Sequence, residues 1–181
     1  MQISETSLPG VLLFTPKIFS DARGAFFEIY NEREMREAGL PTEWRQDNFS
    51  ISTKNVIRGI HYQITQPQGK LVRVVYGTVI DVAVDLRRSS PDFGKHVAVE
   101  LSGENGLALW IPPGFGHAFA VLSEKAGFSY KVTDYYSPGG ERTVLWNDPA
   151  LEIAWPLAAD DAVVSAKDQQ GKLLKDAEIF L

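Results

Sequence analysis

The feature that most constrains the fold is a strict alternation of residue types between Ile80 and Arg87. The apolar set is Ile80, Val82, Val84 and Leu86, and the alternate set is Asp81, Ala83, Asp85 and Arg87. A period of two is that of a β-strand, in which successive side chains point to opposite faces. The alternation therefore predicts a strand with one buried face and one face turned toward something polar.

Similar short runs, separated by Gly and Pro, recur along the chain. Strand-like residues begin at residue 71, and Gly77 in VVYGTV predicts a turn between two strands. Further strands are predicted at 11–14, 25–30, 48–51, 96–101, 107–111, 118–122, 129–133 and 143–146. Many short strands at near-regular spacing favour a sandwich or barrel over a parallel α/β sheet. We therefore expect an all-β jelly roll with a ligand site between its sheets.

Helix signals are few. Asn31 followed by Glu34 resembles a capping box, and Gly39 stands where a helix C-terminus would end, which predicts a short helix over 32–38. The tail from Ser165 is mixed in character and predicts short helical turns.

Length and composition limit the class of protein. A chain of 181 residues corresponds to about one domain, and we expect a single domain over 1–181. There is no cysteine, which excludes disulfides and thiolate metal sites, and no apolar stretch of the ~18 residues that a membrane span needs. The N-terminus lacks a signal-peptide pattern, so a cytoplasmic location is expected. A net charge of −5 without a basic run argues against nucleic-acid binding.

The three histidines differ in their surroundings. His61 lies in VIRGIHYQ, and Arg58 and Lys70 place two cations near this titratable base. If 58–63 is extended, His61 points away from the face shared by its two neighbours and can line a cavity. His117 follows the loop IPPGFG, whereas His96 starts a strand and is expected to be solvated. A structural or surface role is the alternative for each histidine.

Motifs of several other chemistries are missing. No His-x-His occurs, so a metal site would have to be a mixed His/Asp site, which the sequence leaves open. There is also no GxGxxG, GxxxxGK[ST] or GxSxG. Acid–base chemistry by His, Tyr, Asp and Lys remains. Asp168 in SAKD and Tyr130 in FSYKVTDYY are candidates, with a helix cap and simple packing as their respective alternatives.

Seven motifs together resemble the dTDP-4-dehydrorhamnose 3,5-epimerase family, in collinear order from about residue 9 to 171. They are DARGAFFE, QDNFS, VIRGIHYQ, the run from QGKLVR to DFGK, LWIPPGFGHAF, YKVTDYYSP, and WNDP with SAKD. The resemblance implies a cupin-type jelly roll (double-stranded β-helix) without metal or other cofactor, acting as a homodimer. It also implies the substrate dTDP-4-keto-6-deoxyglucose and the third step of dTDP-L-rhamnose synthesis from dTDP-glucose.

The resemblance also implies roles for individual residues. His61 matches the general base, Asp168 its carboxylate partner, Tyr130 the proton donor and Lys70 the cation beside the keto group. The positions that match nucleotide-sugar binding are Arg23, Glu28, Gln46, Asn48, Arg58, His117, Glu141 and Lys167. Family members more often have Leu at Ile60 and Ala at Gly116, and neither difference touches a reacting group.

The implied chemistry suits these residue types. Carbons 3 and 5 flank the ketone, so proton loss from either gives an enolate. Free imidazole, with a pKa of about 6.5, is a suitable base near neutral pH, and a phenol with a pKa of about 10 keeps its proton. Two other functions stay open: an epimerase acting at carbon 3 or carbon 5 alone, and a non-catalytic sugar-binding cupin.

Overall fold

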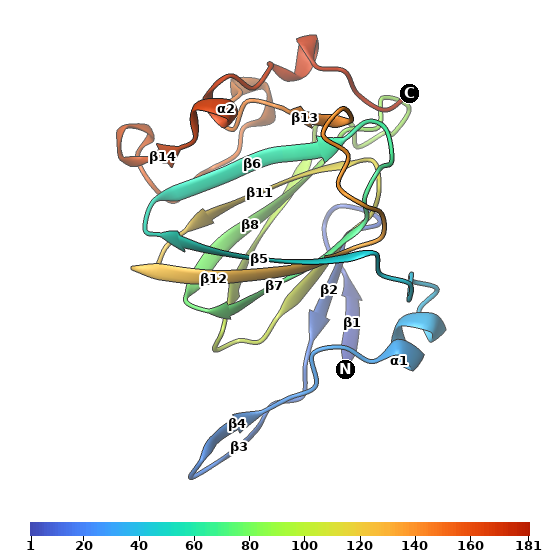
Figure 1. Ribbon diagram of the computed structural model, residues 1–181, viewed down its shortest axis with the longest axis vertical. Helices are drawn as coiled ribbons and strands as arrows, with labels where there is room; N and C mark the ends of the chain where they lie inside the picture. Colours follow the sequence, from blue (N-terminus) through green and yellow to red (C-terminus); the bar gives the residue numbers. More distant parts are fainter.

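A computed structural model describes residues 1–181, and two β-sheets packed face to face form its body (Figure 1). The first sheet has the order β1 (Gln2–Glu5), β2 (Leu12–Thr15), β10 (Ala108–Ile111), β7 (Lys70–Tyr76), β12 (Lys125–Val132) and β5 (Gln46–Thr53). The second has the order β13 (Glu141–Thr143), β6 (Val56–Gln63), β11 (Phe115–Val121), β8 (Thr78–Asp85) and β9 (His96–Ser102). The short strand β14 (Val163–Val164) pairs in parallel with β6.

The chain crosses repeatedly between these sheets. Strands β5, β7, β10 and β12 lie in the first sheet, while β6, β8, β9 and β11 lie in the second. Apolar side chains from both inner faces form the largest core, for example Val72 and Phe128 against Ala83 and Phe115. This arrangement is the cupin-type jelly roll, and the predicted fold class is confirmed.

Strand β8 shows the alternation predicted from sequence, but its surroundings differ from the prediction. Nearly every residue of β8 is buried, including Asp81 and Asp85. Val82 and Val84 pack against residues of the C-terminal segment, such as Leu174 and Ile179. The C-terminal segment thus covers the outer face of the second sheet, so no face of β8 is open to solvent.

The turn at Gly77 is confirmed. Gly77 has φ of +79° between β7 and β8, and a Cβ there would lie 2.1 Å from the backbone oxygen of Lys125. Glycine is therefore required both by the backbone conformation and by the close approach of β12.

Two predicted strands end several residues earlier than expected. The 25–30 strand is only β4 (Gly24–Phe26), because its sole partner is the three-residue strand β3 (Phe19–Asp21) and the chain then turns toward the helix cap. The 143–146 strand is β13, which ends at Thr143, after which Val144 forms an isolated bridge to Lys172 and exchanges backbone hydrogen bonds with Ile60.

Strands β3 and β4 form an arm that projects away from the two sheets (Figure 1). All six of its residues are exposed, including Phe26 at 73%. The predicted helix follows as α1 (Glu32–Glu37), with the Asn31 side chain accepting hydrogen bonds from two backbone N–H groups of the first turn.

The C-terminal segment contains four short helical turns, of which the last two lie in the tail from Ser165, where such turns were expected. They are η1 (Pro149–Leu151), η2 (Ala159–Asp161), α2 (Ala166–Gln169) and η3 (Leu174–Asp176). Helix α2 contacts β6, which places Asp168 beside the strand that carries His61 (Figure 1). None of the helices has the length and apolar character needed to cross a membrane.

Candidate active site

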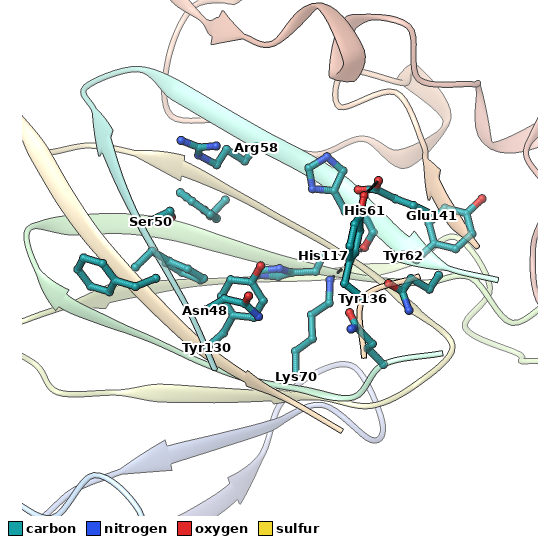
Figure 2. Close-up of a pocket in the computed structure, with 15 residues that line it drawn as sticks. Asn48, Ser50, Arg58, His61, Tyr62, Lys70, His117, Tyr130, Tyr136 and Glu141 are labelled. Atoms are coloured by element: carbon teal, nitrogen blue, oxygen red, sulfur yellow. Dashed lines mark hydrogen bonds between the residues drawn. The ribbon is translucent and has the colours of Figure 1, made fainter. Parts of the chain in front are cut away.

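A cavity of about 320 Å³ opens between the two sheets (Figure 2). Its size falls at the lower end of the range for small-molecule sites. Its wall draws on β5, β7 and β12 of the first sheet and on β6, β11 and β13 of the second. Of the predicted site residues it holds Asn48, Arg58, His61, Lys70, His117, Tyr130 and Glu141.

His61 and Asp168 form a hydrogen-bonded pair at the cavity, although 107 positions separate them in the chain. His61 Nε2 lies 2.6 Å from Asp168 Oδ1, and the backbone N–H of Gly59 donates to Asp168 Oδ2 at 3.2 Å. The carboxylate is buried, whereas the His61 side chain is 31% exposed. Burial raises the pKa of Asp168, but the hydrogen bond from His61 and the electrostatic interaction with that residue outweigh burial, so its pKa is lowered. Asp168 is thus an anion that only accepts hydrogen bonds, and Nε2 carries the proton. Nδ1 is left free to act as a base.

Lys70 and Tyr130 come from the opposite sheet. Lys70 reaches across the cavity, where its Nζ donates to the backbone oxygen of His61 at 3.4 Å. Burial lowers the pKa of Lys70 to about 8, and the negative charges of Asp81 and Glu141 oppose that shift. Burial also raises the pKa of Tyr130, so this phenol keeps its proton at neutral pH. The cavity therefore has a free imidazole nitrogen on one wall and an ammonium and a phenol from the other.

His117 is part of a second histidine–carboxylate pair. Its Nε2 lies 2.8 Å from Asp81 Oδ2, and its ring stacks on Phe128 with 5.8 Å between the centroids. Burial lowers the pKa of His117 more than Asp81 raises it, so the ring is neutral. Asp81 was not among the site residues predicted from the sequence. The only signal for it was a carboxylate inside an otherwise apolar strand.

Other predicted binding residues lie in or beside the cavity. The Nε of Arg58 donates to Ser52 Oγ at 3.0 Å, and Gln46 Nε2 donates to Asn48 Oδ1 at 2.6 Å. Glu141 is bound by Lys167 at 2.5 Å. Its pKa is lowered because hydrogen bonds from Lys167 and Tyr136 outweigh the effect of burial.

Arg23 and Glu28 are not brought to this cavity. Arg23 is on the projecting arm, where it pairs with Asp21 at 2.5 Å, and its side chain is 90% exposed. Glu28 follows the arm and accepts hydrogen bonds from Asn31. His96 is half-buried at the start of β9 and likewise lies outside the cavity.

A segment over 134–140 borders the cavity, and no site residue was predicted within it. Gln63 ties this segment down, because its amide donates to the backbone oxygen of Tyr135 and accepts from the backbone N–H of Ser137. Tyr136 lines the cavity, and its hydroxyl donates to Glu141 at 2.7 Å. Nothing in the sequence around Gln63 indicated this role, since an isolated glutamine in a strand is not distinctive.

The described side chains contain no group of three or more His, Cys, Asp or Glu that could hold a metal ion. Both cavity histidines are instead hydrogen-bonded to single carboxylates. What the cavity does offer is a base, a proton donor and a cation around one small volume. Such a set can remove a proton from an acidified carbon and stabilise the anion that forms.

Comparisons with known proteins agree with this chemistry. The family model for dTDP-4-dehydrorhamnose 3,5-epimerase matches residues 5–176. The chain is 54% identical to the dTDP-4-dehydrorhamnose 3,5-epimerase of Pseudomonas aeruginosa and 50% identical to that of Shigella flexneri, over at least 99% of each protein. It also superposes on the crystal structure of the Legionella pneumophila dTDP-6-deoxy-D-glucose-3,5-epimerase, which is in complex with dTDP-4-keto-L-rhamnose. The TM-score is 0.93 at 47% identity, over 98% of this chain and 94% of that one. Likeness over nearly the whole length, in both sequence and fold, shows that this chain belongs to the dTDP-4-dehydrorhamnose 3,5-epimerase family.

Proposed function

We propose that the protein inverts carbons 3 and 5 of dTDP-4-dehydro-6-deoxy-D-glucose to give dTDP-4-dehydro-L-rhamnose. The observation that carries this proposal is the His61–Asp168 pair at 2.6 Å, set across one cavity from Tyr130 and Lys70. An isolated sugar-binding module would not need a base, its carboxylate partner and a proton donor in one volume.

In the proposed reaction, His61 Nδ1 takes the proton from a carbon next to the ketone. Asp168 stabilises the imidazolium that forms, by the same logic as in a Ser-His-Asp triad. The electron pair of the broken C–H bond moves onto the keto oxygen, and Lys70 supplies positive charge where that oxyanion develops. Tyr130 then returns a proton to the carbon from the other side, which inverts its configuration.

The nucleotide diphosphate is anionic, so the acidic protein needs local cations to hold it. Arg58 at the cavity wall and Lys167 beside Glu141 are suited to this role. Tyr136, with its ring at the cavity, offers a flat surface for the nucleobase.

The direct test is incubation of the protein with dTDP-4-keto-6-deoxyglucose in deuterium oxide, followed by proton NMR of the product. We expect deuterium at both C3 and C5 of a rhamno-configured sugar. Deuterium at one carbon alone would favour the single-site epimerase, and binding without exchange would favour the non-catalytic cupin.

We also propose that the protein acts as a homodimer in which the β3–β4 arm delivers Arg23 to the partner subunit's cavity. Arg23 is 90% exposed on an arm that extends away from its own cavity (Figure 1). Phe26 on the same arm and Ile51 on β5 are also exposed, at 73% and 59%. Exposed large apolar groups of this kind are typical of an interaction surface.

Mixing two inactive variants tests this arrangement. In a mixed dimer of His61→Ala with Arg23→Ala, one of the two cavities has both its own His61 and a partner arm with Arg23. We expect about a quarter of the wild-type rate, because half of the dimers are mixed and each has one complete site. No gain on mixing, or a monomer in analytical ultracentrifugation, would contradict the proposal.

We further infer that the protein works in the cytoplasm, where a nucleotide-activated sugar would be supplied. The lack of cysteine supports this inference. Cell fractionation with an antibody against the protein tests it, and recovery in the secreted fraction would contradict it.

A further inference from the structure

Asp81 is the most deeply buried carboxylate near the cavity, and the reaction steps above do not use it. It lies on the central strand β8 and is 0% exposed. Its Oδ2 contacts His117 Nε2 at 2.8 Å, while its Oδ1 is buried and has no hydrogen-bond partner. A buried carboxylate with an unsatisfied oxygen is costly unless nearby positive charge compensates it.

The nearby positive charge is Lys70. Its ammonium is buried and makes a single hydrogen bond, to the backbone oxygen of His61 at 3.4 Å. Burial alone disfavours a charged lysine, and Asp81 exerts the largest opposing influence, ahead of Glu141. The two groups come from different sheets, since Lys70 is on β7 and Asp81 on β8.

We propose that Asp81 is a positioning residue for the reaction. Its buried carboxylate fixes the orientation and tautomer of His117 and supplies the negative charge that keeps Lys70 an ammonium. The inference rests on the proposed epimerase function, in which Lys70 must be a cation when the keto oxygen gains charge.

The hydrogen bond determines which nitrogen of His117 carries the proton. Because an ionised carboxylate only accepts, Nε2 of the neutral ring must donate to Asp81 Oδ2. Nδ1 is then an acceptor, suited to a hydroxyl group of the substrate. With the opposite tautomer, Nδ1 would carry a proton and would repel such a donor.

Charged and titratable groups from several strands surround Lys70. The other titratable or charged groups lining the cavity are Arg58, His61, Tyr62, His117, Tyr130, Tyr136 and Glu141. Arg58 adds positive charge, the neutral His117 ring and the phenols add none, and Glu141 is paired with Lys167. Asp81 is therefore the anion near Lys70 that is not already held by a cationic side chain.

The main test is the pH dependence of kcat/KM for Asp81→Asn. The amide is isosteric and its oxygen can still accept from His117, but the charge is lost. Lys70 then loses its proton at lower pH, so we expect the alkaline limb of the profile to move down by about one pH unit or more. A purely structural role would lower activity at every pH without moving the limb. Asp160→Asn makes the same change of charge at an exposed position on η2 and is expected to leave the profile unchanged.

Two NMR measurements test the inference without turnover. In protein with 13C-labelled lysine, the Lys70 Cε signal, assigned by its loss in Lys70→Met, should titrate with a midpoint near 8. The midpoint should fall in Asp81→Asn and fall less in Glu141→Gln. In 15N-labelled wild-type protein, His117 should be neutral with the proton on Nε2.

The outcomes separate the two proposals. If wild-type protein turns over substrate but Asp81→Asn has an unmoved limb and an unchanged Lys70 midpoint, the role of Asp81 is wrong and the epimerase function stands. If wild-type protein does not turn over substrate, the function is wrong, and the NMR measurements still decide about Asp81. Should Asp81→Asn fail to fold, the tautomer of wild-type His117 decides, because a proton on Nδ1 would overturn the inference.

Discussion

Replacing Asp168 with asparagine should remove the base function of His61 while leaving the fold in place. The two carboxylate oxygens accept from different donors, His61 Nε2 at 2.6 Å and the Gly59 backbone N–H at 3.2 Å. An amide has only one acceptor oxygen. If that oxygen stays on Gly59, the NH₂ group faces His61 and forces Nε2 to accept. The proton of the ring then moves to Nδ1, the nitrogen that should act as the base.

The size of the effect follows from these two contacts. If the amide turns so that its oxygen accepts from His61, its NH₂ group faces the backbone N–H of Gly59. Two donors then face each other without an acceptor, and an unsatisfied buried group costs about 1–3 kcal/mol. This cost lowers the population of the amide orientation that leaves Nδ1 of His61 free to act as a base by roughly 5- to 150-fold. The variant also lacks the negative charge that stabilises the imidazolium, and the same change in a Ser-His-Asp triad lowers kcat by about 10⁴. We therefore expect Asp168→Asn to lower kcat by ~10³–10⁴.

The assay is the rate of deuterium incorporation at C3 and C5 of dTDP-4-keto-6-deoxyglucose, followed by proton NMR at saturating substrate. Asp160→Asn, an isosteric change of the same charge on exposed η2, is the matched control and should keep wild-type rates. Circular dichroism and thermal unfolding should show that Asp168→Asn remains folded. A folded variant with kcat within about tenfold of wild type would refute the role assigned to Asp168.

Five other predictions concern single residues or the need for a metal. Lys70→Ala should lower kcat by ~10²–10³, because it removes the cation at the developing oxyanion, and an unchanged kcat would contradict that role. Tyr130→Phe should still exchange substrate protons with deuterium oxide but form little inverted product, as measured by NMR, since His61 can still remove the proton. Activity should persist after dialysis against a chelator, and inactivation that is reversed by added metal would contradict the metal-free mechanism. Gly77→Ala should lower the free energy of unfolding by about 1–3 kcal/mol in urea titrations, because its Cβ would meet the Lys125 backbone oxygen and φ is +79°. His96→Ala should match wild type in kcat/KM, because His96 lies outside the cavity.

Local sequence patterns predicted the fold wherever one element determines its own conformation. The alternation over 80–87 predicted β8, and Asn31 predicted the start of α1, because strand periodicity and helix capping depend on neighbouring residues. The 25–30 strand was wrong in extent because its partner is only the short strand β3. Pairing across a sheet is a tertiary property, so no local pattern in 25–30 could give the length of the strand.

Local sequence patterns predicted less of the candidate site than of the fold. Nothing near His61 points to Asp168, and only the family resemblance suggested that the two residues meet. Asp81 was overlooked because a period of two separates two faces but does not say what each face meets. In an ordinary half-exposed strand, the polar residues of such a pattern face water. In β8 the C-terminal segment covers one face, and the other face is turned toward the interior between the two sheets. The same alternation therefore buries Asp81 instead of exposing it to solvent.

The proposed base and the proposed proton donor lie on different sheets, and this separation suits the fold to an inversion. His61 is on β6 and Tyr130 is on β12, which belong to opposite layers of the jelly roll. Facing sheets lie about 10 Å apart, enough for a sugar ring to lie between a side chain from each layer. Two groups on one sheet would approach the ring from the same side, and a proton removed and returned by them would restore the original configuration. Inversion at carbon therefore requires the separation that the two sheets impose, and the chain achieves it with strands that cross from one sheet to the other.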